Sequence, residues 1–146
     1  MDDSIQLIEQ ELAFINDMRA DLIFPPPCFV EMQAKFLYYE SRTMLKVSFP
    51  VTNNIVNPIG TMQGGYISAA FDNVFGPLSY LAARSTCATI DLHTHFLRGI
   101  KSGDTLTITA KVISRGTQIL HMSGEAMNAN GKLIATATSN VMIFKL

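Results

Sequence analysis

Two adjacent glycines, Gly64 and Gly65, stand at the start of an apolar segment that contains a single carboxylate, Asp72. Glycines in the first turn of a helix leave backbone N–H groups approachable, and the unpaired donors and the helix dipole there favour negative charge. Asp72 follows Gly64 by eight residues, or a little over two helical turns. Because an ionised side chain is costly to bury without a purpose or a partner, this spacing predicts a site for an oxyanion beside a functional carboxylate.

Each of these residues also has a structural interpretation. Glycine is the usual residue where backbones crowd, so the pair could serve only as a tight start to a helix. Asp72 could be a structural carboxylate that bonds Ser68 or Asn73. The joint spacing favours the chemical interpretation over both structural ones.

Length and composition predict one domain without strongly charged partners. The chain has 146 residues, of which 48% are apolar, so one domain with a real core is possible. The 11 basic and 12 acidic residues give a net charge of -1. This balance gives no strong positive electrostatic potential that would attract nucleic acid or an anionic membrane, and we expect neither as a partner.

The sequence also predicts a cytoplasmic location. No run of about 18 uncharged apolar residues occurs, because Asp72 interrupts the longest candidate and Arg84 follows it. Residues 1–3 include two acids, unlike the basic start of a signal peptide. Cys28 and Cys87 are too few for a disulfide framework and too isolated for a zinc site, so we expect two reduced thiols.

The N-terminal part of the chain predicts a helix and a connector. Residues 4–20 carry apolar side chains at the spacing of an amphipathic helix. The three prolines at 25–27 cannot continue a helix and predict an extended passage. We therefore expect a single domain over residues 1–146, with a helix and proline-rich connector over 1–27 and a core over 32–146.

The core sequence predicts two short strands, a helix and four longer strands. Pro77 is expected to kink the helix or to end its regular portion. The expected elements are a hairpin at 36–39 and 45–51, a loop at 52–62, a central helix from 64 to about 84, and strands at 90–96, 104–114, 117–127 and 132–144. Such an order is α+β, and its sheet must bury one face. A long curved antiparallel sheet wrapped around one central helix is the hotdog fold.

Three segments carry a resemblance to a known family. Residues 57–72, the segment Ala88–Leu92 and the segment Gly131–Ala135 resemble hotdog-fold acyl-CoA thioesterases of the phenylacetate-pathway and thioesterase-superfamily-member-2 type. The likeness covers roughly residues 35–144. Those enzymes show an Asn, a loop, His-Gly-Gly and then an Asp or Glu on the central helix. Asn57, the two glycines and Asp72 keep this order and spacing.

The resemblance implies hydrolysis of an acyl thioester at a site shared across a dimer interface. The N–H of Gly64 would polarise the thioester carbonyl, and Asp72 of the neighbouring subunit would act as general base or nucleophile. An apolar, partly dry site would make that carboxylate a stronger base. Thr89 would help to position the attacking water, and Asn57 would orient the carbonyl or the loop. Gly65 would contact the substrate.

Gln63 departs from the family pattern, because it stands where the family has His. Glutamine can donate and accept hydrogen bonds but cannot change its charge near neutral pH. If the histidine acts by orientation, Gln63 can replace it, and we favour this interpretation. The alternative is a non-catalytic hotdog protein that binds acyl-CoA or only assembles. A hydratase or dehydratase fits least, since no histidine lies near the glycine pair.

The remaining candidates concern ligands and assembly. Arg98 and Arg115 lie at expected strand ends, where the phosphates of coenzyme A could meet them. Asp91, His93 and His95 share one strand face, but a further ligand is lacking, so we expect no metal and no other cofactor. Free strand edges predict a homodimer or a dimer of dimers, a homotetramer.

Four aromatic residues of the central helix have two interpretations. They could line an acyl tunnel, although aromatic residues at helical spacing more often belong to the core. They are Tyr66, Phe71, Phe75 and Tyr80.

Overall fold

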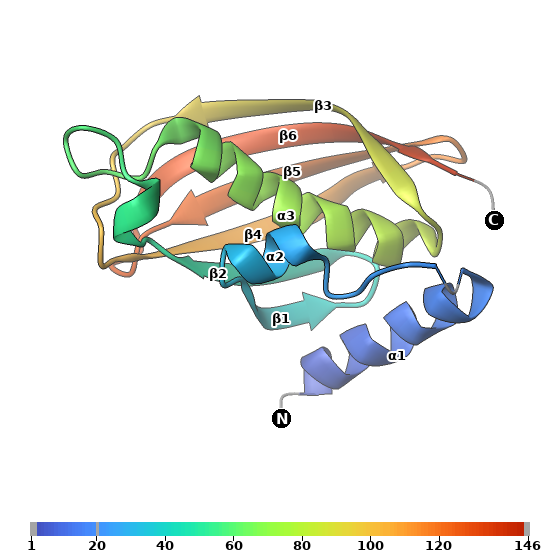
Figure 1. Cartoon of the computed structure of the whole chain (residues 1–146). Helices are drawn as coiled ribbons and strands as arrows, with labels where there is room; N and C mark the ends of the chain where they lie inside the picture. The colour runs from blue at the N-terminus through green and yellow to red at the C-terminus, as the bar shows by residue number, and fades with distance from the viewer. Residues whose placement is uncertain (1–2, 20, 145–146) are drawn as a thin grey trace.

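The computed structural model describes residues 3–19 and 21–144, in which a curved antiparallel sheet wraps along one long helix (Figure 1). The helices are α1 (Asp3–Met18), α2 (Pro27–Glu31) and α3 (Gly64–Ala83), with a 3-10 turn at Asn53–Ile55. The strands are β1 (Lys35–Glu40), β2 (Met44–Pro50), β3 (Cys87–Phe96), β4 (Thr105–Arg115), β5 (Ile119–Met127) and β6 (Leu133–Ile143). Their order in the sheet is β1-β2-β4-β5-β6-β3, and all neighbours are antiparallel. This arrangement confirms the predicted α+β hotdog fold.

The helix α3 fills the concave face of the sheet. Its Phe71 and Phe75 rings have no exposed surface, and they stack at a centroid distance of 6.0 Å. Opposite them on β5 lies Gly124, where an added Cβ would approach both rings to 3.1 Å. The absence of a side chain at Gly124 therefore lets the aromatic face of α3 pack closely on the sheet.

Of the two effects predicted for Pro77, an end to the regular helix is wrong, because α3 continues through Pro77 to Ala83. Proline disfavours a helical conformation in the preceding residue through a clash with its Cβ, and that residue is Gly76, which has none. Buried side chains on both sides of Pro77, among them Phe75 and Leu78, hold the helix against the sheet. Packing thus offsets the lost backbone hydrogen bond.

The N-terminal segment differs from the expected extended connector. The connector ends in the short helix α2, in which Pro27 is the first helical residue and Pro26 the N-cap. Proline suits this position because its N–H would be unpaired there in any case. The helix α1 packs three buried residues, Ile8, Leu12 and Ile15, toward β1 and α3.

The strand β3 forms one edge of the sheet and pairs only with β6 (Figure 1). Its pairing register shifts between Thr89 and Asp91, so Ile90 is an extra, bulged residue that is 52% exposed. At the other edge, α1 packs on β1. The edge at β3 is therefore open to a further strand. Within residues 3–19 and 21–144, no helix has both the length and the apolar character needed to span a membrane.

Candidate active site

The start of α3 presents two unpaired backbone donors. Gln63 is the N-cap, and its side-chain oxygen Oε1 accepts a hydrogen bond from the N–H of Tyr66 at 3.1 Å. Among the described residues, the N–H groups of Gly64 and Gly65 have no hydrogen-bond acceptor. A Cβ at Gly65 would lie 2.8 Å from Gln63 Oε1, so the cap needs glycine there. The helix therefore begins with two donors free to bind an oxyanion.

A cavity of about 440 Å³ opens beside these donors, and Asn57, Gly64 and Arg98 all line it. The ring of Phe96 covers Gly64 on one side, since a Cβ at Gly64 would meet its Cζ atom at 3.1 Å. Phe96 is nevertheless 54% exposed. The ring can thus shield the helix terminus from water on one side while the other side stays accessible.

Asn57 holds the loop before α3. Its Nδ2 donates to Thr61 Oγ1 at 2.8 Å, and its Oδ1 accepts from the N–H groups of Ile59 and Thr61. These three bonds use the side-chain amide within the turn. Of the two roles the resemblance implied for Asn57, this geometry favours orientation of the loop.

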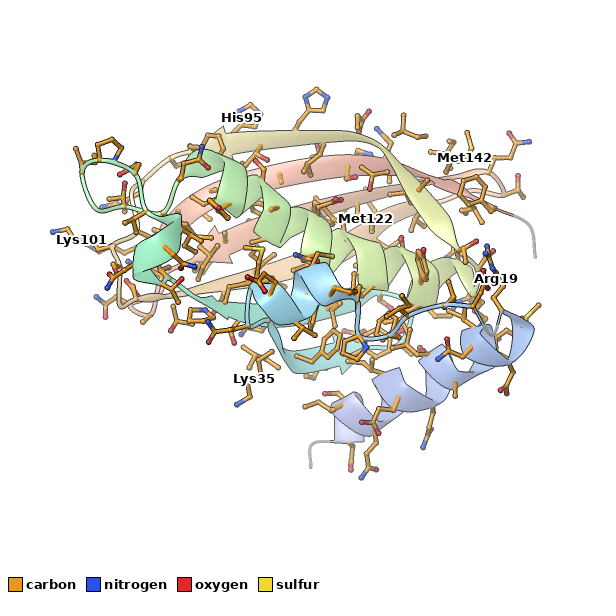
Figure 2. All side chains as sticks on the ribbon, viewed as in Figure 1. Arg19, Lys35, His95, Lys101, Met122 and Met142 are labelled. Atoms are coloured by element: carbon orange, nitrogen blue, oxygen red, sulfur yellow. The ribbon has the colours of Figure 1, made fainter. Side chains whose placement is uncertain are left out.

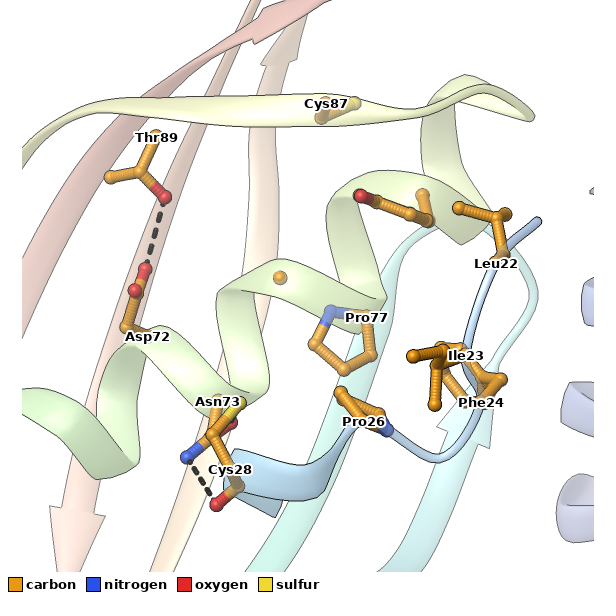
Figure 3. Close-up of a pocket in the computed structure, with 12 residues that line it drawn as sticks. Leu22, Ile23, Phe24, Pro26, Cys28, Asp72, Asn73, Pro77, Cys87 and Thr89 are labelled. Carbon is orange, nitrogen blue, oxygen red and sulfur yellow. Dashed lines mark hydrogen bonds between the residues drawn. The ribbon is translucent and has the colours of Figure 1, made fainter. Parts of the chain in front are cut away.

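Asp72 and Thr89 meet at the middle of α3. The hydroxyl of Thr89 donates to Asp72 Oδ1 at 3.0 Å, from β3 to α3 (Figure 3). The structural alternatives for Asp72 are not observed, because Ser68 donates to Thr94 and Asn73 bonds Cys28. In the single chain the Asp72 side chain is exposed, whereas the apolar sequence around it predicted burial. The reason is that α3 turns this one face toward the open edge at β3.

A second cavity, of about 210 Å³, lies beside Asp72 and Thr89. Apolar residues from three separate parts of the chain form most of its wall, including Leu22, Phe24, Pro26, Pro77, Tyr80 and Cys87 (Figure 3). A small apolar chamber beside a carboxylate can hold an apolar group and place its reactive end at the carboxylate.

The structure separates the predicted site residues other than Arg115 into two groups. Gln63, Asn57, Gly64, Gly65 and Arg98 lie around the start of α3, whereas Asp72 and Thr89 line the other cavity. The two cavities share no lining residue. Eight residues of helix separate Gly64 from Asp72, a rise of about 12 Å. One thioester group cannot contact both within a single protomer.

Arg115 lies at the opposite end of α3 from Gly64. Its Nη1 donates to the carbonyl oxygen of Ala82 at 3.2 Å, where Arg42 donates as well. Ala82 is about 27 Å of helix from Gly64. Within one protomer, Arg115 therefore stabilises the C-terminus of α3 and does not join Arg98 in one cavity.

Three aromatic residues of α3 divide between the core and the Asp72 cavity, and both cysteines lie at that cavity. Phe71 and Phe75 belong to the core, whereas Tyr80 lines the Asp72 cavity. Cys28 and Cys87 are both free thiols and both line that cavity, which their isolation in the sequence did not indicate. Burial raises the pKa of the Cys87 thiol to about 11, so it stays protonated at neutral pH.

The histidines of β3 do not gather with further metal ligands. Asp91 accepts two hydrogen bonds from the side chain of Asn140, and these hold the pKa of Asp91 below its usual range. His95 projects from β3 away from α3 (Figure 2). In the part of the chain that the structure describes, no group of three or more His, Cys, Asp or Glu side chains could hold a metal ion.

Comparisons with known proteins agree with this fold. The sequence profile of the thioesterase superfamily matches residues 59–135. The E. coli PaaI protein from the phenylacetic acid degradation operon superposes with a TM-score of 0.81 at 20% identity, covering 95% of this chain and 96% of that one. A phenylacetic acid degradation-related protein of Ralstonia eutropha JMP134 gives a TM-score of 0.75 at 28% identity, covering 89% of this chain and 98% of that one.

A third structure was solved with a ligand. It is a hypothetical thioesterase of Streptococcus pneumoniae TIGR4 with coenzyme A, and it gives a TM-score of 0.72 at 21% identity, covering 76% of this chain and 85% of that one. A search of curated proteins gives no match. Because the family profile spans more than half of the sequence, the chain belongs to the thioesterase superfamily. It is a thioester hydrolase with the hotdog fold.

Proposed function

We propose that this protein hydrolyses acyl-CoA thioesters at a site that two protomers build together. The observation that carries the proposal is the division of the site: Gly64, with its unpaired N–H, lines one cavity and the carboxylate Asp72 another, about 12 Å of helix apart. The Streptococcus relative, solved with coenzyme A, supports coenzyme A as the carrier. A complete site then needs the Gly64 cavity of one protomer and the Asp72 cavity of the next.

The open edge of the sheet supports this assembly. Two copies related by a two-fold axis at β3 would continue the sheet and run their α3 helices antiparallel. The start of one α3 would then face the second and third turns of the other, which carry Asp72. Such a contact would also cover Ile90 and Phe96, two large apolar residues of β3 that are exposed in the single chain.

Hydrolysis in this site follows from the groups present. The N–H of Gly64 donates to the thioester oxygen and stabilises the negative charge that develops there. Asp72 of the neighbouring protomer takes a proton from water, whose oxygen bonds to the acyl carbon. The C–S bond breaks, and the proton passes to the leaving thiolate to give coenzyme A and a free acid. Thr89 holds the carboxylate in place through its 3.0 Å hydrogen bond.

The alternative role for Asp72 is that of a nucleophile, which would form a mixed anhydride with the acyl group before water releases it. Heavy oxygen found in the Asp72 side chain after a single turnover in heavy-oxygen water reveals the nucleophilic role, because water has then opened the anhydride at the carboxyl carbon of Asp72. Direct attack by water places the heavy oxygen in the released acid alone.

Gln63 and Arg98 complete the proposed site. Gln63 acts through orientation, because its oxygen caps α3 and keeps the two N–H donors in place. Arg98 is exposed and lines the Gly64 cavity, so its guanidinium can bind a phosphate of coenzyme A.

Release of coenzyme A thiol from a panel of acyl-CoAs tests the proposal. We expect turnover of at least one member of the panel, with equal amounts of thiol and free acid formed. Binding without turnover would instead support the non-catalytic hotdog protein that Gln63, in the position of the family's histidine, suggests. Neither binding nor turnover would reject both functions.

A further inference from the structure

A third cavity lies directly behind the wall of the Asp72 cavity. It is a groove of about 440 Å³ between α1 and the segment that leads to α2 and β1. Apolar side chains dominate its lining, among them Ile5, Ile8, Leu12, Phe29 and Phe36. Ile8, Leu12 and Phe29 are buried in the core, which makes the floor of the groove firm.

Phe24 is the residue that the groove and the Asp72 cavity share. Its side chain lines both, although the two cavities have no other lining residue in common. Phe24 is partly buried and packs against the core, so it stands between the two spaces as a wall. Figure 3 shows Phe24 on the segment that closes the Asp72 cavity on the side away from Thr89.

We infer that Phe24 sets the length of acyl chain that the enzyme accepts, and that the α1 groove is an extension of the acyl site which Phe24 closes. This inference rests on the proposed function, since it assigns the Asp72 cavity to the acyl group. The cavity of about 210 Å³ holds the equivalent of roughly seven water molecules of about 30 Å³ each. An acyl group of a few carbons, or one with a single ring, fills this space and then meets Phe24.

The occupant of the extended site is the methylene tail of a long acyl group. Such a tail needs an apolar surface that continues from the reactive end, and the groove provides one on the far side of a single side chain. Charged or polar ligands fit the lining poorly, because only Glu9 and Asn16 of its ten residues are polar.

The test compares chain-length profiles of the wild type and Phe24→Ala with butanoyl-, octanoyl-, dodecanoyl- and hexadecanoyl-CoA. Removal of the ring joins the two cavities, and each further methylene buried gains about fourfold in binding. We expect kcat/KM for dodecanoyl-CoA, relative to butanoyl-CoA, to rise at least about tenfold, mainly through a lower KM. An unchanged profile in folded Phe24→Ala overturns the inference.

Two further variants make the test specific. Val30 lines neither the Asp72 cavity nor the groove and is 58% exposed, so Val30→Ala should keep the wild-type chain-length profile. Ala13 is exposed and lines the groove, so Ala13→Phe fills it and should cancel the gain in the Phe24→Ala background. The same gain in Val30→Ala, or no loss on adding Ala13→Phe, also contradicts the inference.

Phe24→Leu carries the same test, with a smaller expected shift, if Phe24→Ala does not fold. Binding of dodecanoic acid, measured by calorimetry, separates this inference from the proposed function. Tighter binding to Phe24→Ala without turnover of any acyl-CoA would reject the proposed thioesterase activity. It would still support the inference that Phe24 separates the Asp72 cavity from the groove. Turnover by Phe24→Ala with an unchanged dependence on chain length would support the thioesterase activity and reject the role of Phe24.

Discussion

Asp72 is a carboxylate whose neighbours on α3, Phe71 and Asn73, are both buried, while its own side chain is exposed and held by Thr89. A carboxylate kept in this position costs little in the single chain. In the proposed dimer a substrate and a second protomer would close over it, which would exclude water and strengthen its interactions.

The first prediction concerns Asp72. Asp72→Asn retains an oxygen that accepts from Thr89 but removes the base, so we expect kcat to fall by roughly 10²–10⁴-fold with the fold intact. Thiol release and circular dichroism measure the two properties. Asp17→Asn, an exposed change on α1, is the matched control and should behave as the wild type. Equal activity in Asp72→Asn would remove this residue from the mechanism.

A second prediction concerns Gln63. An imidazole nitrogen can accept the hydrogen bond that Tyr66 N–H gives to Gln63, so Gln63→His should fold and keep its activity within about tenfold of the wild type. Gln63→Ala lacks the cap and should lose about 1 kcal/mol of unfolding free energy. Urea titrations and thiol release measure these effects. Misfolding of Gln63→His would show that our account of this loop is wrong.

At the scale of elements, close packing of α3 on the sheet depends on Gly124. A methyl group there would approach Phe71 and Phe75 to 3.1 Å, so we expect Gly124→Ala to cost about 1–3 kcal/mol through overpacking. The neighbouring Ser123→Ala on the outer face of β5 should change the unfolding free energy by less than about 0.5 kcal/mol. Urea unfolding of both variants is the measurement. Equal unfolding free energies would mean that the rings of Phe71 and Phe75 can move away from the added methyl group without loss of stability.

Periodicity in the sequence predicted the long elements well, because the buried positions of α3 and the strands recur at fixed intervals. It predicted a central helix to about residue 84 but not why the helix stays regular past Pro77, which depends on Gly76 and on packing against the sheet. The helix α2 and the bulge at Ile90 also depend on tertiary contacts and pairing register. Such features carry no periodic signal.

The sequence likewise predicted part of the candidate site and missed the rest. The spacing of Gly64 and Asp72 was readable because both lie on one helix. The cavity beside Asp72 was not, because its wall combines residues far apart in the chain, such as Phe24, Tyr80 and Cys87. The exposure of Asp72 likewise depends on β3 being an edge strand, which is a property of the whole sheet.

For the whole molecule, the open edge at β3 predicts how copies assemble. Ile90→Asp places a charge on that edge, so we expect it to weaken the dimer and lower activity together. Ile113, on β4, is also the extra residue at a register shift and is similarly exposed, at 59% against 52%. Ile113→Asp is therefore the matched control and should stay dimeric. Sedimentation measures the oligomeric state of both variants, and thiol release measures their activity. A dimeric, fully active Ile90→Asp would exclude the β3 edge as the dimer interface.

The central claim is that each active site takes its N–H donor from one protomer and its carboxylate from the other. Gly64→Pro removes the donor at a first helical position that suits proline, and Gln63 before it is already extended, with ψ at 137°. Gly64→Pro and Asp72→Asn should each be inactive alone. Each mixed dimer would nevertheless contain one site with both groups intact.

Complementation between these two variants tests the claim most directly. After joint refolding in equal amounts, half of the dimers are mixed and each holds one intact site of two, so about a quarter of wild-type activity should return. If mixed dimers form, as shown by pull-down through a tag on one variant, and activity stays at the sum of the separate variants, the shared site is contradicted.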